Sequence, residues 1–475
     1  MKYIFYDLET TGKDKDWSQI IQFAAIVVDE NLEVLDSYES KCRLKTGLVP
    51  EPEALLVNNN KISELSSLNF SHYDLIKKIK SKFKSWSPAI FFGFNSIQFD
   101  EEILRKSFFK SLFDVYITQL EGNKRGDLLN VVRSASFFNE ESIKTLTNNK
   151  GKKSFRLEDL TKANNMEHYA HDAMGDVLAT IELAKIIKEK VPEVWEQSLS
   201  NCHKNEVENF LFENDFFLNF EYNFGRANFN FLTYICSHPK YKYPQCYDVS
   251  IDPKDLLNLN YTDLKKRIRE KPTFLKSIQH NKHPSIFKIS YAKSLKLLTE
   301  IDEKLYYERV SLIKQNVEFK ERIKLILNEQ FEEKEEIKSQ VDVLAEESLY
   351  KGGFPSYKDK LLMKKFHEVS WEEKFNISDQ FEDERFKYFA YKILYEEAPE
   401  MLPKLVFNNI HKTIANQILT LEDVNWFTLP KAYKQIDDLR EKFKHENDEE
   451  KLKFLSEINE FLEKMQTIYE PATNL

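Results

Sequence analysis

The strongest constraint on the fold is a short apolar segment that runs directly into two carboxylates near the start of the chain. Residues 3–6 are Tyr-Ile-Phe-Tyr, and Asp7 and Glu9 follow them. Side chains two residues apart on a strand point to the same side, so both carboxylates project together beyond one end of a sheet. Adjacent negative charges are unfavourable unless a cation joins them, which favours a site for Mg²⁺ or Mn²⁺. In a chain with 78 Asp and Glu residues, however, Asp-x-Glu also occurs by chance.

Strands and helices alternate over the first 190 residues. Val177, Ile181, Ala184 and Ile187 recur at helical spacing and predict one apolar helix face. The alternation predicts an α/β layer domain. The predicted strands are residues 3–6, 20–28, 33–38 and 89–94, and the predicted helices are residues 74–86, 100–109, 157–165 and 173–188.

The pattern changes near residues 191–192. From about 207 to 250 the sequence is aromatic and β-like, and helical periodicity follows to about 345. After Gly352 and Gly353 the chain reads as helices, including a charged antiparallel pair at 432–444 and 448–469. We therefore expect three domains, at residues 1–190, 191–345 and 346–475.

The charge of the chain depends on the region. The 475 residues carry 69 Lys and Arg against 78 Asp and Glu, a net charge of −9, which as an average disfavours a nucleic-acid partner. The three regions hold 27 basic and 28 acidic, 23 and 24, and 19 and 26 residues in turn, so the excess lies in the last. Residues 271–299 contain six lysines and neither Asp nor Glu. This stretch is either a phosphate-facing surface or a solvated lysine face.

Cysteine spacing and hydropathy exclude several classes of protein. The cysteines are Cys42, Cys202, Cys236 and Cys246, and the nearest approach to a zinc site, Cys236 and Cys246 with His238, lacks a fourth ligand. Free buried thiols are favoured instead. No run of about 18 apolar residues and no signal-peptide pattern is present, which predicts a cytoplasmic protein without a membrane span.

Three further polar residues occur where predicted helices begin. Asp100 follows the strand at 89–94, and His171 and Asp176 flank the start of the helix at 173–188. Taken singly, Asp100 reads as a helix cap and His171 as a structural residue. Together with Asp7 and Glu9, they bring four carboxylates and one histidine to one end of the predicted sheet.

This ordered set of residues resembles the DEDDh superfamily of 3′–5′ exonucleases, whose catalytic domain is ribonuclease H-like. The sequences at residues 5–12, 22–26, 154–164 and 170–174 are similar to those of the bacterial exonuclease I family. So are Phe224-Gly225-Arg226, where an SH3-like domain begins in that family, and residues 349–354, at the start of its helical C-terminal domain. The resemblance implies a multidomain α/β protein with these three parts.

The resemblance also implies a reaction and a set of roles. The substrate would be single-stranded DNA, degraded from its 3′ end to 5′-mononucleotides with two Mg²⁺ or Mn²⁺ ions. Asp7, Glu9 and Asp176 would bind the metals, Asp100 would act through a metal-bound water, and His171 would be the general base. The predicted substrate contacts are Glu9, Leu8, Thr10, Arg105, Arg133 and Arg156.

Several alternatives stay open. Arg156 could instead pair with Glu158 or Asp159. The chain could be an RNA-directed DEDDh exoribonuclease, which would need contacts to the 2′-hydroxyl, or a non-catalytic single-strand-binding protein. The resemblance further implies a monomer that acts in DNA repair and is recruited by the acidic tail of single-stranded DNA-binding protein.

Overall fold

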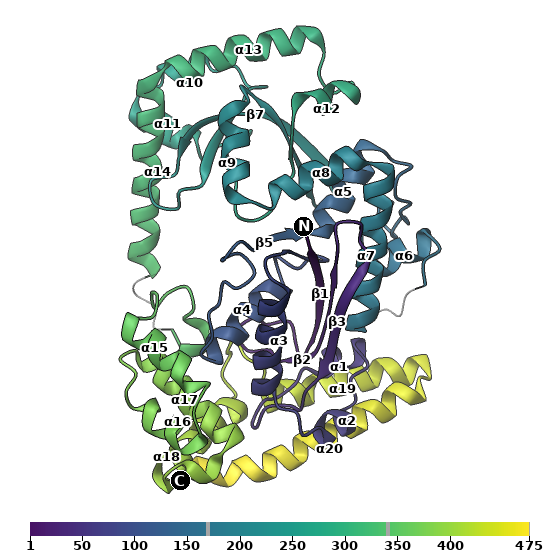
Figure 1. Cartoon of the computed structure of the whole chain (residues 1–475), viewed down its shortest axis with the longest axis vertical. Coiled ribbons are helices and arrows are strands. Elements are labelled where there is room, and N and C mark those ends of the chain that lie inside the picture. Colours follow the sequence, from purple (N-terminus) through teal and green to yellow (C-terminus); the bar gives the residue numbers. More distant parts are fainter. Residues whose placement is uncertain (168–171, 339–342, 475) are drawn as a thin grey trace.

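The first five strands form one mixed sheet in the order β3-β2-β1-β4-β5. β1, β2 and β3 are antiparallel, whereas β4 and β5 run parallel to β1. The computed structural model describes residues 1–167, 172–338 and 343–474, and Figure 1 shows this sheet in the middle of the molecule. The strands are β1 Tyr3–Thr10, β2 Ile20–Val28, β3 Val34–Lys41, β4 Ile90–Gly93 and β5 Lys124–Asp127.

Helices cover both faces of this sheet because alternate residues of β1 are apolar on each side. Tyr3 and Phe5 pack toward α7, and Ile4 and Tyr6 pack toward α3 and α4. The predicted apolar face of α7 is confirmed, since its four residues are buried. The helices are α1 Pro52–Val57, α2 Ile62–Ser67, α3 His72–Trp86, α4 Asp100–Lys110, α5 Leu128–Phe138, α6 Leu157–Ala163 and α7 Ala173–Lys190.

A second, antiparallel sheet follows, in the order β10-β6-β7-β8-β9. The two edge strands, β9 and β10, lie within the lysine-rich stretch at residues 271–299, where no strand was predicted. They are three and two residues long and are held by pairing with β8 and β6. The elements are β6 Phe217–Asn223, β7 Arg226–Ser237, β8 Pro244–Asp248, β9 Leu275–Ser277, β10 Ile286–Phe287, α8 Pro192–Asn201, α9 Lys204–Glu213, α10 Lys254–Asn258, α11 Tyr261–Arg267, α12 Ile289–Ser294, α13 Glu300–Gln315 and α14 Val317–Lys338.

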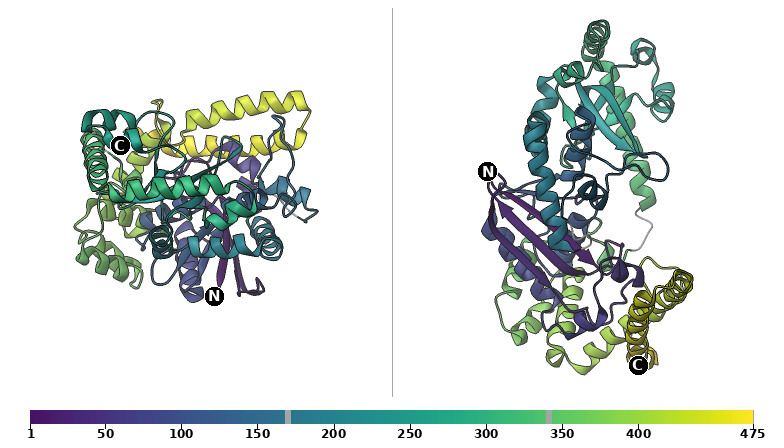
Figure 2. Two further views of the ribbon diagram at one scale, coloured as in Figure 1. Left: turned by 90° about the horizontal axis from the view of Figure 1, so that it is seen from above. Right: turned by 90° about the vertical axis from the view of Figure 1, so that its right-hand side faces the viewer.

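The C-terminal part is helical and ends in the predicted antiparallel pair, α19 and α20. Asn447 joins the two helices in the left-handed conformation, with φ 54°. Leu455 and Leu462 of α20 pack in one core with Leu55 and Leu65 of α1 and α2. Figure 2 shows this pair and the second sheet at opposite ends of the molecule. The elements are η1 Ala345–Glu347, α15 Tyr357–Phe366, α16 Trp371–Ser378, α17 Glu384–Glu397, η2 Pro399–Met401, α18 Lys404–Leu419, α19 Leu429–Glu446, α20 Glu449–Tyr469 and η3 Glu470–Asn474.

Candidate active site

Three carboxylates meet at the end of β1. Asp7 and Glu9 lie on the same side of this strand, opposite Ala24 and Gln22 of β2, and Asp176 lies in the first turn of α7. One carboxylate oxygen from each of Asp7, Glu9 and Asp176 lies within 4.8 Å of the other two. The strand and the helix therefore bring together the three residues that the sequence predicts as metal ligands.

Asp100 approaches the same cluster from α4. It is the first residue of that helix, while Phe99 occupies the capping position, so the cap interpretation of Asp100 does not hold. Its side chain is buried, and its charge acts on both Asp7 and Glu9. The fourth predicted carboxylate is thus also directed toward the site.

The crowding of negative charge changes the ionisation of these groups. Burial, followed by the charges of Asp100, Asp176 and Glu9, holds the pKa of Asp7 well above its usual range. Burial and the charges of Asp176 and Asp100 raise the pKa of Glu9 from 4.5 to about 8. Burial, then the neighbouring carboxylates, likewise raises the pKa of Asp100 from 3.8 to about 8. Asp7, Glu9 and Asp100 thus resist ionisation until a cation offsets the neighbouring negative charges.

The donor set fits a hard divalent cation. Mg²⁺ and Mn²⁺ prefer oxygen ligands, and all three converging groups are half-buried carboxylates. Because the residues repel one another when ionised, a bound cation would remove the electrostatic cost of holding them together. The geometry and the charge of Asp7, Glu9 and Asp176 therefore both fit a candidate metal site.

This arrangement predicts how metal and pH together affect stability. Because the folded-state pKa values of Glu9 and Asp100 are raised, the folded metal-free protein binds more protons than the unfolded chain between about pH 4.5 and pH 8. These groups therefore destabilise the metal-free fold progressively as pH rises through that window. We expect Mg²⁺ to raise the melting temperature more at pH 8 than at pH 5.5, measured against EDTA at each pH. An equal Mg²⁺ effect at both pH values would contradict the assignment.

Asp127, at the end of β5, holds the loop that leads from β4 to Asp100. The sequence analysis did not identify this residue. Its carboxylate accepts hydrogen bonds from the main-chain N–H of Asn95 at 2.9 Å and of Ile97 at 3.3 Å. It also caps α5 through the N–H of Leu129. β5 reads Lys-Arg-Gly-Asp and has no apolar pattern, so the available signal was the Asp directly before the apolar start of α5.

The start of α7 is fixed by Asp172. Its Oδ2 accepts from the N–H of Gly175 at 3.1 Å and its Oδ1 from the Nε2 of Gln22 at 2.9 Å. This links the helix that carries Asp176 to the strand beside Glu9. The predicted base, His171, lies outside the described residues, directly before this cap.

Arg105 is placed in a buried ion-pair network instead of an open substrate surface. Its side chain donates to Oε1 of Glu101 at 2.8 Å and of Gln119 at 3.1 Å, and Glu101 also pairs with Arg125 at 3.1 Å. Arg105 is 6% exposed, and Nη1 and Nη2 of its guanidinium have partners within the protein, while its buried Nε has none among the described residues. We do not retain it as a phosphate contact.

This placement predicts a stability effect for Arg105. Arg105→Met leaves Glu101 with one fewer partner, and breaking a buried pair costs about 3–5 kcal/mol. We expect a lower melting temperature and an unchanged Kd for single-stranded DNA below that temperature. Arg440→Met on α19 is the matched control. Lost DNA binding with unchanged melting would instead restore Arg105 as a substrate contact.

The other predicted substrate contacts differ in accessibility. The side chain of Leu8 is in the core, and the hydroxyl of Thr10 donates to the main-chain oxygen of Gly12 at 2.8 Å. Arg156 is exposed and pairs with Oε1 of Glu158 at 2.9 Å, the alternative that the sequence left open. An exposed pair of this kind contributes little stability, so Arg156 remains available to a ligand.

Arg133 lines a cleft between the two sheets. This cleft has a volume of about 420 Å³ and extends from the residues before Asp100 to β6 and the segment before β10. The guanidinium of Arg133 lies 5.0 Å from the ring centre of Tyr222, and its buried Nε has no hydrogen-bond partner among the described residues. The lining residues include Asn95, Gln98, Asn130, Arg133, Asn219, Phe220, Tyr222 and Lys282.

The lysine-rich stretch is divided in its roles. Lys282 lines the cleft, whereas Lys276 pairs with Glu221 at 3.4 Å and Lys293 with Glu303 at 2.7 Å. Lys282 therefore faces the cleft, whereas Lys276 and Lys293 face carboxylates of the same chain. The four cysteines are buried free thiols, and no described helix has the length and apolarity needed to cross a membrane.

Comparison with known proteins accounts for both ends of the chain. A family model described as "Exonuclease" matches residues 4–184, and one described as "Exonuclease I C-terminal domain" matches residues 343–465. The chain thus carries both an exonuclease domain and an exonuclease I C-terminal domain. The ribonuclease H-like exonuclease domain and the helical C-terminal domain that the sequence predicted are confirmed, and the SH3-like character of the second sheet stays a prediction.

Several curated proteins named exodeoxyribonuclease I are similar to this chain, over different lengths. Exodeoxyribonuclease I of Haemophilus influenzae is 34% identical over 212 residues, 44% of this chain and 45% of that protein. The Escherichia coli protein is 34% identical over 208 residues, 43% of this chain and 44% of the relative. These alignments span less than half of either relative. The protein of Buchnera aphidicola subsp. Baizongia pistaciae is 27% identical over 380 residues, 77% of this chain and 78% of the relative.

Solved structures extend the likeness in fold to nearly the whole chain. Exonuclease I from Methylocaldum szegediense has a TM-score of 0.81 at 23% identity, and it covers 98% of this chain and 99% of its own. Escherichia coli exonuclease I in complex with a dA16 oligonucleotide gives the same TM-score and coverage at 24% identity. The second sheet and its helices therefore share the fold of these exonuclease I structures, although they lie outside the two matched family models.

Proposed function

We propose that this chain is an exodeoxyribonuclease I, which hydrolyses single-stranded DNA from its 3′ end and releases 5′-mononucleotides. The observation that carries the proposal is the convergence of Asp7, Glu9 and Asp176, with Asp100 beside them, in a domain that matches the exonuclease family. We also propose a monomer with domains at residues 1–190, 191–345 and 346–475, acting in the cytoplasm in DNA repair.

The roles of the residues follow from their chemistry. Asp7, Glu9 and Asp176 would hold two divalent ions, Mg²⁺ or Mn²⁺, and Asp100 would complete the carboxylate set. When bound, such ions neutralise the phosphate and stabilise the leaving oxygen. His171 would take the proton from the attacking water, because a histidine side chain can accept and release a proton around neutral pH.

We propose the cleft between the two sheets as the path of the DNA strand. It begins beside the residues that precede Asp100, and it combines a cation, amide side chains and aromatic rings. This combination suits single strands, because bases stack on aromatic rings and phosphates are attracted by positive charge. Related Escherichia coli structures hold dA16 and dT13 oligonucleotides. The main-chain groups of Leu8 and Thr10, with Glu9 and Arg156, would contact the terminal nucleotide.

The cleft assignment predicts the effect of Arg133→Met on binding. Removal of one phosphate contact should weaken the affinity for single-stranded DNA and lower the slope of log affinity against log salt by about 0.7. Fluorescence anisotropy across a salt series, with EDTA present to prevent cleavage, measures both quantities. Arg440→Met is the matched control and should leave the slope unchanged. An unchanged slope for Arg133→Met would place the strand elsewhere.

One cleavage assay with three substrates distinguishes the DNA exonuclease from the exoribonuclease and from the non-catalytic binding protein. Labelled single-stranded DNA, duplex DNA and RNA are incubated with the protein and Mg²⁺, with EDTA in parallel. We expect nucleotide release from single-stranded DNA that EDTA abolishes. Faster release from RNA would favour the exoribonuclease alternative, and binding without release from any substrate would favour the non-catalytic one.

We further propose that single-stranded DNA-binding protein recruits this enzyme through its acidic tail. A related structure is of an SSB/exonuclease I complex with an inhibitor. Basic patches on the second and third domains would receive the tail, because positive surface attracts an acidic peptide.

A further inference from the structure

Asn58 is a buried polar residue beside the candidate metal site, and none of the roles assigned above uses it. It is 6% exposed, and its Nδ2 donates to the main-chain oxygen of Thr10 at 3.0 Å. The carboxylate of Glu9 also accepts a hydrogen bond from the Asn58 side chain. An asparagine amide has two N–H donors, so one side chain can hold both groups. Asn58 therefore contacts both the end of β1 and one of the predicted metal ligands.

The orientation of this amide is fixed by its other contacts. Oδ1 of Asn58 accepts from the main-chain N–H of Asn60 at 3.2 Å, and the main-chain oxygen of Asn58 accepts from Nδ2 of Asn60 at 3.2 Å. A main-chain N–H can only donate, so the oxygen of the Asn58 amide must face Asn60. The NH₂ group of Asn58 is thereby directed toward β1.

The sheet alone does not fix the end of β1. The pairing register with β2 shifts between Glu9 and Thr10, so that Glu9 lies opposite Gln22 and Thr10 lies opposite Ile20. Irregularities of this kind disrupt the ladder locally and re-aim side chains near active sites. A contact from outside the sheet is therefore needed to hold the Glu9 side chain in one orientation, and Asn58 supplies it.

Asn58 is itself held in place by the C-terminal helices. It directly follows α1, a helix of six residues without a side-chain cap at its N-terminus, and isolated helices of this length are unstable. The main-chain N–H of Glu53, in the first turn of α1, donates to Oε1 of Gln435 on α19 at 3.1 Å. Leu55 is buried in one core with Leu455 of α20. The C-terminal pair of helices therefore holds α1, and with it Asn58, against the exonuclease domain.

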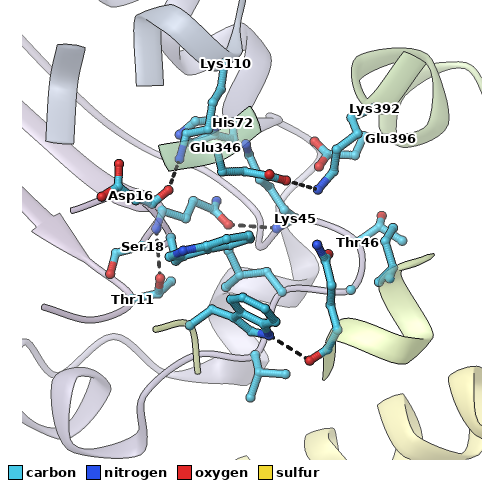
Figure 3. A pocket seen from close by; sticks show the side chains of 18 of the residues that line it. Thr11, Asp16, Ser18, Lys45, Thr46, His72, Lys110, Glu346, Lys392 and Glu396 are labelled. Atoms are coloured by element: carbon cyan, nitrogen blue, oxygen red, sulfur yellow. Dashed lines mark hydrogen bonds and ion pairs between the residues drawn. The ribbon is translucent and has the colours of Figure 1, made fainter. Parts of the chain in front are cut away.

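The turn that joins β1 to β2 is contacted by the C-terminal part as well. Nε1 of Trp17 in this turn donates to Oε1 of Glu347 at 2.9 Å. Figure 3 shows Asp16 of the same turn and the ion pair of Glu346 with Lys392 around a cavity of about 120 Å³. The residues after β1 and the helix before Asn58 thus both rest on the C-terminal part of the chain.

We propose that Asn58 is a positioning residue of the metal site, which orients Glu9 from a helix that α19 and α20 hold in place. Asn58 is neutral, so it restrains the carboxylate without replacing the cation, and a carboxylate that accepts one hydrogen bond retains lone pairs for a metal. Partners of this kind orient the ligands of metal sites in general. The inference rests on the proposed metal-dependent activity and adds a residue to its site.

Manganese binding tests the proposal without any cleavage. Titration calorimetry of the full chain with Mn²⁺, in the absence of DNA, gives the Kd of the site. Asn58→Leu keeps the approximate shape of the side chain but removes its donors, and it should raise this Kd about tenfold or more, the usual cost of losing the partner of a metal ligand. Asn58→Ala removes the same donors without added bulk and should have a similar effect. Asn376→Leu, at an exposed position on α16, is the matched control and should bind Mn²⁺ as the unmodified chain does.

Two further measurements separate positioning from stability and from the proposed function. The melting temperature in EDTA gives the range in which each variant is folded, and the Mn²⁺ titrations are made below it. An unchanged Kd in folded Asn58→Leu and Asn58→Ala would overturn the proposal, even if their melting temperatures fell. Asp7→Asn should lose most of the Mn²⁺ binding. If the unmodified chain bound no Mn²⁺, or Asp7→Asn bound it equally well, the proposed metal-dependent function would fail together with this inference.

The role of the C-terminal helices is tested by Gln435→Leu. This variant removes the acceptor for the N–H of Glu53 but leaves Leu55 in its core, so we expect a smaller increase in the Kd for Mn²⁺ than in Asn58→Leu. When combined with Asn58→Leu it should add little, because both substitutions act through the same contact with Glu9. Unchanged Mn²⁺ affinity in Gln435→Leu, or full additivity in the double variant, would overturn the role assigned to α19.

Discussion

Asp7→Asn is expected to reduce turnover on single-stranded DNA by about 10³-fold or more. The amide preserves the shape of the side chain but removes the charge at the centre of the cluster with Glu9 and Asp176. Metal ions supply several kcal/mol of charge stabilisation in such reactions, and each 1.36 kcal/mol changes the rate tenfold. Steady-state release of mononucleotides with Mg²⁺ measures the effect.

Asp7→Asn lowers turnover, but the same substitution should stabilise the metal-free protein. Asp7 is repelled by Asp100, Asp176 and Glu9, so its neutralisation should raise the melting temperature in EDTA at pH 8. Asp114→Asn, at an exposed position after α4, is the matched control and should change neither quantity. Full activity of Asp7→Asn would show that the metal assignment is wrong.

His171→Ala should lower turnover by about 10²–10⁴-fold, the usual contribution of a positioned general base. The substitution removes the proposed acceptor of the proton from water but leaves the carboxylates and the cleft unchanged. The Kd for single-stranded DNA, measured in EDTA, should therefore stay the same. His445→Ala, at the C-terminal end of α19, is the control. Loss of DNA binding or of melting temperature in His171→Ala would make His171 a structural residue.

The carboxylates of the candidate site could be predicted because each lies at the boundary of an element with a clear apolar pattern. β1 is apolar up to Asp7, and α7 has a helical apolar face that begins after Asp176. Local sequence is enough to define elements of this kind. In an α/β sheet, the ends of parallel strands and the starts of the helices that follow them lie at one end of the sheet. The order of the residues along the chain was therefore enough to bring them together.

The features that the sequence missed depend on contacts between distant segments. β5 is charged and is held by pairing with β4, so Asp127 was not recognised as the residue that fixes the loop before Asp100. β9 and β10 are strands because their neighbours are strands. Arg105 was predicted as a substrate contact from the family resemblance, whereas in the structure its side chain donates to Glu101 and Gln119.

End-labelled single-stranded DNA tests the central claim most directly. One oligonucleotide carries its label on the 3′ nucleotide and a second carries it on the 5′ nucleotide, and each is incubated with the protein and Mg²⁺. We expect the 3′ label to be released at once as a mononucleotide, while the 5′ label stays on strands that shorten stepwise. Immediate release of the 5′ label, internal cleavage, or no release would contradict it.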